Sequence, residues 1–265
     1  ALYGHALFIL EVTVLDLSSF FHQHPSGALA LSGEVDSPLL CWAAGRWGSG
    51  WQAFFVHSAF QPAFERSDAR ALSQQCGVPL TVLEADVLSL QAVAANPPDR
   101  CYHCKQAIFS AILEAAKAAG LPLVIDGTNA SDDASDRPGM RALRELEVRS
   151  PLRECGLTKA DVRRLSREAG LPTWDKPAYA CLATRIPTGT PLRQDDLARV
   201  EQAEAALAAL GLRDFRVRLR NGGALVQVTA AQQPFAQSSW QQIAAALEPL
   251  TGKAELDPQP RTPSD

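Results

Sequence analysis

The stretch ALALSGEVDSPLLCWAAGR, residues 28–46, decides the fold class. It joins a short apolar run, which predicts a buried strand, to a segment with helical spacing. Short apolar runs and helical segments continue to alternate as far as about residue 175. This alternation is typical of an α/β fold, in which helices cover both faces of a parallel sheet. Nucleotide sites in such sheets lie beyond the carboxyl ends of the strands.

The pattern after residue 174 differs from that of the first part. Residues 174–193 carry three prolines and a glycine, so we expect a connecting loop there. The helical and alternating segments that follow predict a small α+β domain. The expected strands lie at 28–31, 52–57, 79–85, 121–126, 147–152, 215–220 and 224–228, and the helices at 37–46, 63–76, 102–119, 158–169, 194–211 and 237–250. The predicted domain organisation is an N-terminal extension (1–27), an α/β domain (28–180), a small domain (181–256) and a disordered tail (257–265).

The loop LSGEVDS (31–37) carries the first chemical signal. A loop that opens a helix presents backbone N–H groups and the positive end of the helix dipole to an anion. Gly33 permits a tight turn, and Ser32 and Ser37 add hydroxyl donors. Asp36 is suited either to capping the helix or to helping hold Mg²⁺. The loop therefore predicts a phosphate site, with an ordinary capped turn as the alternative.

The composition excludes several classes of protein. The chain has 265 residues, 46% of them hydrophobic and 20% charged, which is ordinary for a globular protein and not for a disordered one. The net charge of −4 argues against a broad electrostatic surface for nucleic acid. The apolar run at 6–21 contains Glu11 and Asp16 and is shorter than the ~20 residues that span a bilayer. We expect no membrane segment, no signal peptide and a cytoplasmic location.

Six cysteines are too few for a disulfide scaffold in a chain of this length. Cys101 and Cys104, in NPPDRCYHCK (96–105), are predicted to share one face of a helix. Such a pair serves as a redox couple, half of a zinc site or part of an iron–sulfur site. The remaining cysteines outside the loop at 174–193 are expected to be packing residues: Cys41, Cys76 and Cys155.

Cys181 lies in KPAYACLATR (176–185), within the predicted connecting loop. Arg185 and Lys176 flank it, and cationic surroundings favour the thiolate form of a cysteine. The sequence therefore predicts a reactive thiol, with an inert, half-buried cysteine as the alternative.

Several of these segments together resemble a known enzyme family. LSGEVDS is similar to the SGGxDS loop of the PP-loop ATP pyrophosphatases, with Glu34 in place of the second glycine. Further segments resemble the LarE-type ATP-dependent sacrificial sulfur transferases of that superfamily: NPPDRCYHCK (96–105), DGTNASDDASDRPGMRAL (126–143) with RSPL (149–152), and LPTWDKPAYACLATRIPTGTP (171–191). The resemblance covers roughly residues 28–230. It implies a parallel-sheet PP-loop domain, of the adenine nucleotide alpha hydrolase-like kind, with a small α+β C-terminal domain.

The resemblance also implies a reaction. ATP, with Mg²⁺, adenylates a carboxylate of pyridinium-3,5-biscarboxylic acid mononucleotide and releases pyrophosphate. A sulfur nucleophile then displaces AMP and leaves a thiocarboxylate, in the biosynthesis of a nickel-pincer cofactor. In one branch of the family the cysteine matching Cys181 gives up its own sulfur. In the other branch three cysteines hold a [4Fe–4S] cluster; Cys101, Cys104 and Cys181 match this set, and we expect the cluster branch.

The resemblance assigns further residues. Cys181 and Arg185 match catalytic positions; the positions matched for ATP are Ser32, Gly33, Asp36, Ser37, Asp126, Thr128 and Asn129; those matched for the substrate anion are Glu201, Arg216 and Arg218. Asp126 is equally suited to binding a metal ion and to capping a strand end. A solvated strand face is the alternative for Arg216 and Arg218, which alternate along one strand.

Other functions remain open from the sequence. A tRNA thiolase of the same superfamily needs a basic face, which the charge of −4 does not favour. An amide-forming synthetase of the superfamily does not need the three cysteines. A non-catalytic relative is the third possibility, and Glu34 is the residue that favours it. The expected partners are a small mononucleotide substrate and further copies of the chain, since the family often forms homo-oligomers, with no membrane and no nucleic acid.

Overall fold

The computed structural model describes residues 16–132, 138–220 and 222–262, which divide into two compact units. The first unit comprises the described parts of Ala1–His57, Ala63–Ala85 and Cys101–Lys176, and the second those of Ser58–Pro62, Asp86–Arg100 and Pro177–Asp265. The first 15 residues of the predicted N-terminal extension and the last three of the predicted tail lie outside the described residues.

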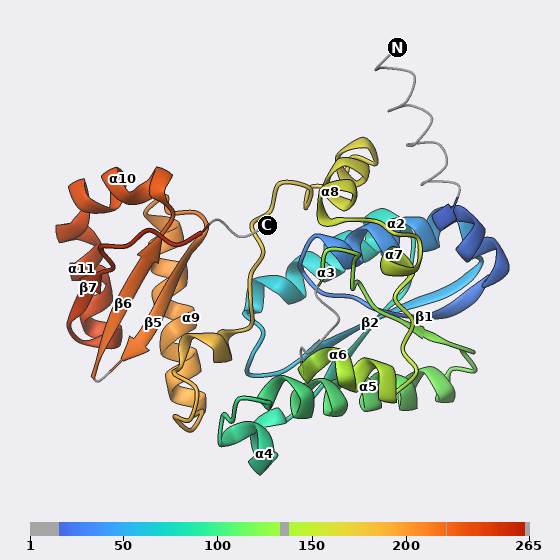
Figure 1. The fold of residues 1–265 in the computed structure, drawn as a ribbon, viewed down its shortest axis with the longest axis horizontal. Coiled ribbons are helices and arrows are strands. Elements are labelled where there is room, and N and C mark those ends of the chain that lie inside the picture. The colour runs from blue at the N-terminus through green and yellow to red at the C-terminus, as the bar shows by residue number, and fades with distance from the viewer. Residues whose placement is uncertain (1–15, 133–137, 221, 263–265) are drawn as a thin grey trace. The chain divides into compact units, whose positions relative to one another are not determined.

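A four-stranded parallel sheet forms the centre of the first unit, with the strand order β3-β2-β1-β4. Its strands are β1 (Ser26–Ala30), β2 (Gly50–His57), β3 (Leu80–Glu84) and β4 (Val124–Ile125). Its helices are α2 (Asp36–Trp47), α3 (Ala63–Cys76), α5 (Arg100–Ala118), α6 (Pro138–Glu145), α7 (Pro151–Glu154) and α8 (Lys159–Glu168). Figure 1 shows α2 and α3 on one face of the sheet and α5 and α6 on the other.

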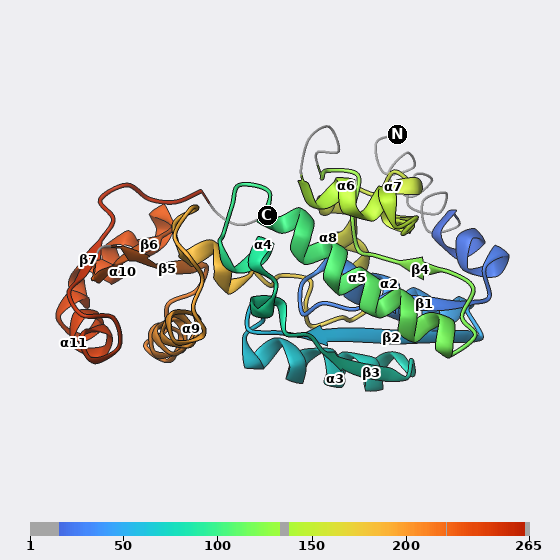
Figure 2. The ribbon, with the colours of Figure 1, turned by 90° about the horizontal axis from the view of Figure 1, so that it is seen from below.

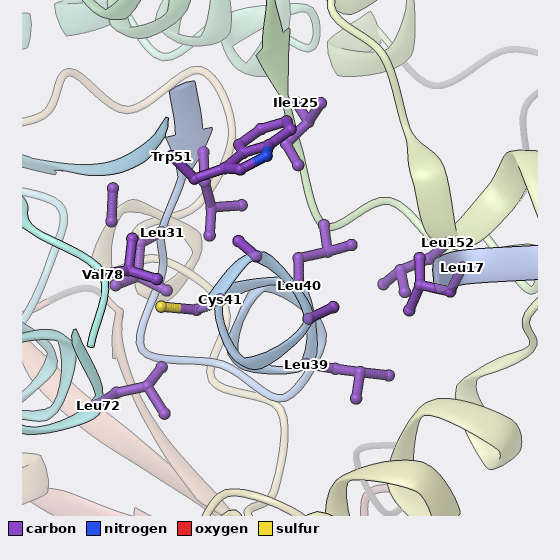
Figure 3. Close-up of a cluster of buried hydrophobic side chains, with 14 of the residues drawn as sticks. Leu17, Leu31, Leu39, Leu40, Cys41, Trp51, Leu72, Val78, Ile125 and Leu152 are labelled. Atoms are coloured by element: carbon purple, nitrogen blue, oxygen red, sulfur yellow. The ribbon is translucent and has the colours of Figure 1, made fainter. Parts of the chain in front are cut away.

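Each face of the sheet has its own core because alternate strand residues point to opposite faces. Leu29 and Phe55 pack with residues of α2, α3 and α8, in the cluster that Figure 3 shows around α2. Ala28 and Phe54, one position away along the same strands, pack with residues of α5 and α6 instead. Burial on both faces explains why these strands are short, continuous apolar runs.

The strand predicted at 147–152 is wrong. Only Arg149 makes a bridge, to Ile125, and its backbone exchanges hydrogen bonds with the chain around β4. Pro151 then begins the short helix α7. Proline has no N–H for a strand ladder and is favoured at the first position of a helix, which explains the difference.

The second unit has a three-stranded sheet in the order β5-β6-β7, with β5 antiparallel and β7 parallel to β6. Its strands are β5 (Phe215–Arg220), β6 (Gly223–Val228) and β7 (Ala254–Leu256). Its helices are α4 (Gln91–Ala94), α9 (Gln194–Ala209), α10 (Gln233–Ser238) and α11 (Trp240–Thr251), with short 3₁₀ helices η1 (Val87–Ser89), η2 (Leu182–Arg185) and η3 (Ala230–Gln232). Figure 2 shows α9 and α11 on the same face of this sheet.

The fold class predicted from the sequence is confirmed: a parallel α/β sheet is accompanied by a small α+β unit. Part of the segment predicted as a tail, residues 257–262, is described in the structure. The backbone N–H groups of Asp257 and Arg261 donate to the carbonyl groups of Val226 and Val228, so the chain runs beside β6 as far as Arg261. Within the described ranges, no helix is both long enough and apolar enough to cross a membrane.

Candidate functional site

The loop after β1 closes on the first turn of α2. The backbone N–H of Ser32 donates to Oγ of Ser37 (2.8 Å), and the two hydroxyl oxygens lie 3.0 Å apart. A Cβ on Gly33 would lie 3.1 Å from Cα of Glu65, so this position has little room for a side chain. No side chain caps the start of α2. The uncapped helix end gives the loop the geometry of an anion site.

Asp36 joins three segments of the first unit. Its Oδ1 accepts from Nδ2 of Asn129 (3.0 Å), and its Oδ2 accepts from Nζ of Lys159 (2.6 Å). Asp36 therefore does not cap α2, which was one of its two predicted roles. The structure brings together Asp36 and Asn129, which the sequence assigned to one ATP site, because the neighbouring strands β1 and β4 both end at this edge of the sheet.

Asp126 and Thr128 follow β4 and are both buried. One carboxylate oxygen of Asp126 accepts from Oγ1 of Thr128 (2.5 Å), and the other accepts from Oγ of Ser150 (2.6 Å). Gly127 lies between them, and a Cβ there would be 2.8 Å from the backbone nitrogen of Ser37. The β4 loop thus packs directly against the start of α2.

Two lysines contact the loop after β1 (residues 31–37) or the first residue of α2. Nζ of Lys176 donates to the carbonyl oxygen of Gly33 (2.7 Å) and to Asp68 (2.6 Å), while Lys159 contacts Asp36. Burial raises the pKa of the half-buried Glu34 carboxyl, although Lys159 and Lys176 oppose this shift. Each lysine forms an ion pair beside the loop, Lys159 with Asp36 and Lys176 with Asp68.

Residues 177–185, called here the Cys181 loop, belong to the second unit. The carbonyl oxygen of Cys181 accepts from the backbone N–H (3.0 Å) and Oγ1 (2.8 Å) of Thr184. Nη1 of Arg185 donates to the carbonyl oxygen of Ala180 (2.6 Å), and its Nε and Nη2 donate to Glu204 (2.8 and 3.1 Å). The Arg185 side chain is 0% exposed, so its guanidinium holds the loop to α9 from inside the unit.

Arginines from β5 contact the same loop. Arg216 donates to the carbonyl oxygen of Ala178 (2.5 Å), and Arg218 donates to that of Thr184 (2.6 Å). Arg216 is buried, so the alternative of a solvated strand face does not hold for it. Burial, followed by the charge of Arg185, lowers the pKa of Arg216 to about 10. Glu204 and Asp214 oppose this shift, and a carboxylate oxygen of Asp214 lies 3.8 Å from Nη1 of Arg216.

Glu204 is the buried carboxylate on α9 that sequence reasoning missed. Its Oε1 also accepts from the backbone N–H of Val217 (2.9 Å), and the Tyr179 hydroxyl donates to its Oε2. Burial, followed by Glu204, raises the pKa of Tyr179, so this hydroxyl keeps its proton. Glu201, which the sequence assigned, lies one turn earlier on α9 and is half-buried. Their spacing of three residues puts both on neighbouring positions of the helix, and the sequence carries no signal that separates them.

The segment before Cys101 is also tied to the Cys181 loop. Arg100 donates to Oδ1 of Asn96 (2.7 Å) and to the carbonyl oxygen of Ala183 (3.2 Å). Nδ2 of Asn96 donates to the carbonyl oxygens of Pro187 (2.9 Å) and Thr190 (3.1 Å). The residue that precedes Cys101 therefore contacts the chain two residues after Cys181.

All six cysteines lie in the described part of the chain, and none is in a disulfide. Cys101 is exposed and Cys104 half-buried, on successive turns of α5 in the first unit, whereas Cys181 belongs to the second. Neither unit, over its described residues, groups three His, Cys, Asp or Glu side chains so that they could hold a metal ion.

No family model matches the chain. Two proteins nevertheless resemble it over more than three quarters of its length. It is 35% identical to an uncharacterized protein of Synechocystis sp., with 86% of each chain covered. It is 33% identical to the pyridinium-3,5-bisthiocarboxylic acid mononucleotide synthase of Lactiplantibacillus plantarum, over 77% of this chain and 75% of that protein. An uncharacterized protein of Methanocaldococcus jannaschii is 30% identical over 51% of this chain and 54% of its own.

Proposed function

The chain belongs to the LarE family of sulfur transferases, and from that premise we propose that it makes a thiocarboxylate from a carboxylate of pyridinium-3,5-biscarboxylic acid mononucleotide. ATP activates the carboxylate, and the sulfur is delivered at Cys181. The observation that carries the proposal is the Cys181 loop, to which three guanidinium groups donate: Arg185 to Ala180, Arg216 to Ala178 and Arg218 to Thr184. This excess of positive charge suits a substrate that bears a phosphate and two carboxylates.

The first step needs the loop after β1. A carboxylate oxygen attacks the α-phosphorus of ATP, the bond to the β-phosphate oxygen breaks, and pyrophosphate leaves. The N–H groups at the start of α2, with Lys159 and Lys176, supply the positive charge for the phosphates. Asp36 and Asp126 would hold Mg²⁺, since this ion usually takes one or two carboxylates together with phosphate oxygens.

The second step replaces oxygen with sulfur. The Cys181 sulfur attacks the acyl carbon of the adenylate, AMP leaves with the carboxylate oxygen, and a thioester to Cys181 remains. Loss of the Cα proton of Cys181 then breaks its Cβ–S bond, which frees the thiocarboxylate and leaves dehydroalanine. Arg185 and Thr184 fix the backbone of Cys181 in this step through its carbonyl oxygen and that of Ala180.

A [4Fe–4S] cluster on Cys101, Cys104 and Cys181 is the alternative source of sulfur. Three thiolates suit such a cluster, but the described residues of the first unit supply two of them and those of the second unit one. When bound, the cluster would supply an iron-held sulfide as the transferable sulfur.

The proposed reaction is tested with the purified full-length chain, ATP, Mg²⁺ and the pyridinium dicarboxylate mononucleotide. We expect pyrophosphate, AMP and a product in which one oxygen is replaced by sulfur, detected by mass spectrometry. Nicotinic acid mononucleotide, which has a single carboxylate, is the matched control substrate. ATP cleavage that is independent of the dicarboxylate, with no sulfur in any product, contradicts the proposal.

Iron content distinguishes the two sulfur sources. If the cluster is present, anaerobically purified protein carries about four irons per chain, and Cys101→Ala loses them while Cys155→Ala keeps them. If Cys181 is the donor, the protein carries no iron and Cys181 loses one sulfur after a single turnover, as seen by peptide mass spectrometry. Four irons in Cys101→Ala would rule out the three-cysteine ligand set.

Glu34→Gly is expected to lower the KM for ATP about tenfold, which corresponds to ~1.4 kcal/mol. A carboxylate near the polyphosphate repels it, and interactions between nearby charges at a protein surface are of this order or larger. Glu34→Gln is the matched control, because it removes the charge and keeps the size. Equal gains in both variants assign the effect to charge, and a gain in glycine alone assigns it to space. An unchanged KM in both shows that Glu34 does not impair ATP binding.

A further inference from the structure

Two cysteines outside the functional site lie on neighbouring helices of the first unit. Cys41 lies on α2 and is 0% exposed, whereas Cys76 is the last residue of α3 and is only partly buried. Cys41 belongs to the core cluster on that face of the sheet, and Cys76 packs against that cluster. Each thiol shifts the pKa of the other, raising that of Cys41 and lowering that of Cys76. The proposed reaction uses neither residue.

The surrounding packing holds the two helices close together at this point. A Cβ on Gly45 of α2 would lie 2.0 Å from the carbonyl oxygen of Cys76, so the backbones meet directly. In Figure 3 the Cys41 sulfur points away from the α2 axis, to the side where Leu72 and Val78 lie. These two residues precede and follow Cys76 in the chain, and both are buried in the same cluster. Gly45 thus lets α2 approach the end of α3, where Cys76 lies, one helical turn from Cys41.

We propose that Cys41 and Cys76 form a dithiol that hydroperoxides oxidise reversibly to a disulfide, which links α2 to α3. Cys76 is the thiol that peroxide reaches first, because it is partly exposed. Cys41 is the resolving thiol, since it is shielded from solvent and lies on the helix that meets the backbone of Cys76. The inference does not depend on the proposed sulfur transfer.

The chemistry balances in two steps. The Cys76 sulfur attacks one oxygen of hydrogen peroxide, the O–O bond breaks, and water leaves with the thiol proton, so that Cys76 becomes a sulfenic acid. The Cys41 sulfur then attacks the Cys76 sulfur, the S–O bond breaks, and a second water leaves with the Cys41 proton. Two thiols lose two electrons, and the peroxide gains them. The Cys76 thiol, followed by burial, raises the pKa of Cys41, and Cys76 is the more exposed of the two, which favours this order of reaction.

The Cys41–Cys76 disulfide would link α2, which begins at the loop after β1, to α3. A cross-link between distant residues restricts the unfolded chain, so the oxidised protein should unfold at a higher temperature than the reduced one. Dithiothreitol should reverse the effect, because the thiol form is restored by disulfide exchange.

The test treats the full-length chain with hydrogen peroxide, blocks remaining thiols with iodoacetamide and maps the peptides by mass spectrometry. We expect a Cys41–Cys76 cross-linked peptide, lighter by two hydrogens than the two thiol peptides, that disappears with dithiothreitol. Its formation should be accompanied by a higher Tm. Cys155→Ser, which changes another half-buried thiol of the same unit, should give the same cross-link.

Cys41→Ser removes the resolving thiol and should leave Cys76 as a sulfenic acid that dimedone traps. The inference is overturned if peroxide carries Cys76 of the unaltered chain to the sulfinic acid without any link to Cys41. It is also overturned if cross-links appear only among Cys101, Cys104 and Cys181. These outcomes are read from the unaltered chain, so they do not require the variant to fold.

Discussion

Cys181→Ser is expected to lower thiocarboxylate formation by more than about a thousandfold, because removal of a nucleophile takes away the covalent route. The serine variant should still release pyrophosphate, since the first step uses the loop after β1 in the other unit. Pyrophosphate is measured by a pyrophosphate-release assay and the thiocarboxylate by mass spectrometry, in the same reaction. The two measurements separate the two steps.

Cys155→Ser is the matched control for Cys181→Ser, because it makes the same atomic change in a half-buried cysteine that the reaction does not use. It should leave both products at the level of the unaltered chain. Full thiocarboxylate yield from Cys181→Ser would remove Cys181 from the reaction. Loss of pyrophosphate release together with the thiocarboxylate would instead couple the two steps at this residue.

Glu204→Ala is expected to lower the free energy of unfolding by roughly 3–5 kcal/mol. The change leaves the guanidinium of Arg185 buried without its counter-charge, and it also removes the acceptor for the Tyr179 hydroxyl and the Val217 N–H. Urea unfolding followed by circular dichroism measures the loss. Glu248→Ala, an exposed glutamate on α11 of the same unit, should change the free energy by less than about 0.5 kcal/mol.

A second variant separates charge from shape at this position. Glu204→Gln keeps an oxygen acceptor for Val217 but loses the charge that pairs with Arg185, so it should fall between the unaltered chain and Glu204→Ala. A loss in Glu204→Ala no larger than that in Glu248→Ala would show that the buried ion pair does not hold the Cys181 loop.

Local patterns predicted most of the elements. The helix at 63–76 agrees with α3 at both ends, and the strands on either side of it are displaced by no more than two residues. These segments are bounded by clear changes of periodicity, which local sequence carries. The prediction of a fifth strand is wrong because Pro151 has no N–H to donate to a strand ladder, although the apolar pattern of a strand continues there.

The partners of the charged groups could not be predicted in the same way. Lys159 meets Asp36 across 123 positions of sequence, and Lys176 meets Gly33 across 143. Only the folded chain brings such residues together, and a lysine after a helix cap carries no sign that it faces a phosphate loop. The sequence named the loop residues from their order after a strand, whereas their partners follow from the tertiary structure.

The division of the chain has a consequence for protein engineering. The sequence passes from one unit to the other five times, after residues 57, 62, 85, 100 and 176. Phe60 and Asn96, far upstream, supply backbone and amide contacts to the segment 182–190. In a chimaera that exchanges only the residues after 176 with those of a homologue, the Cys181 loop and the segments 58–62 and 86–100 would therefore come from different proteins. A graft that also carries 58–62 and 86–100 would transplant the loop together with its own scaffolding.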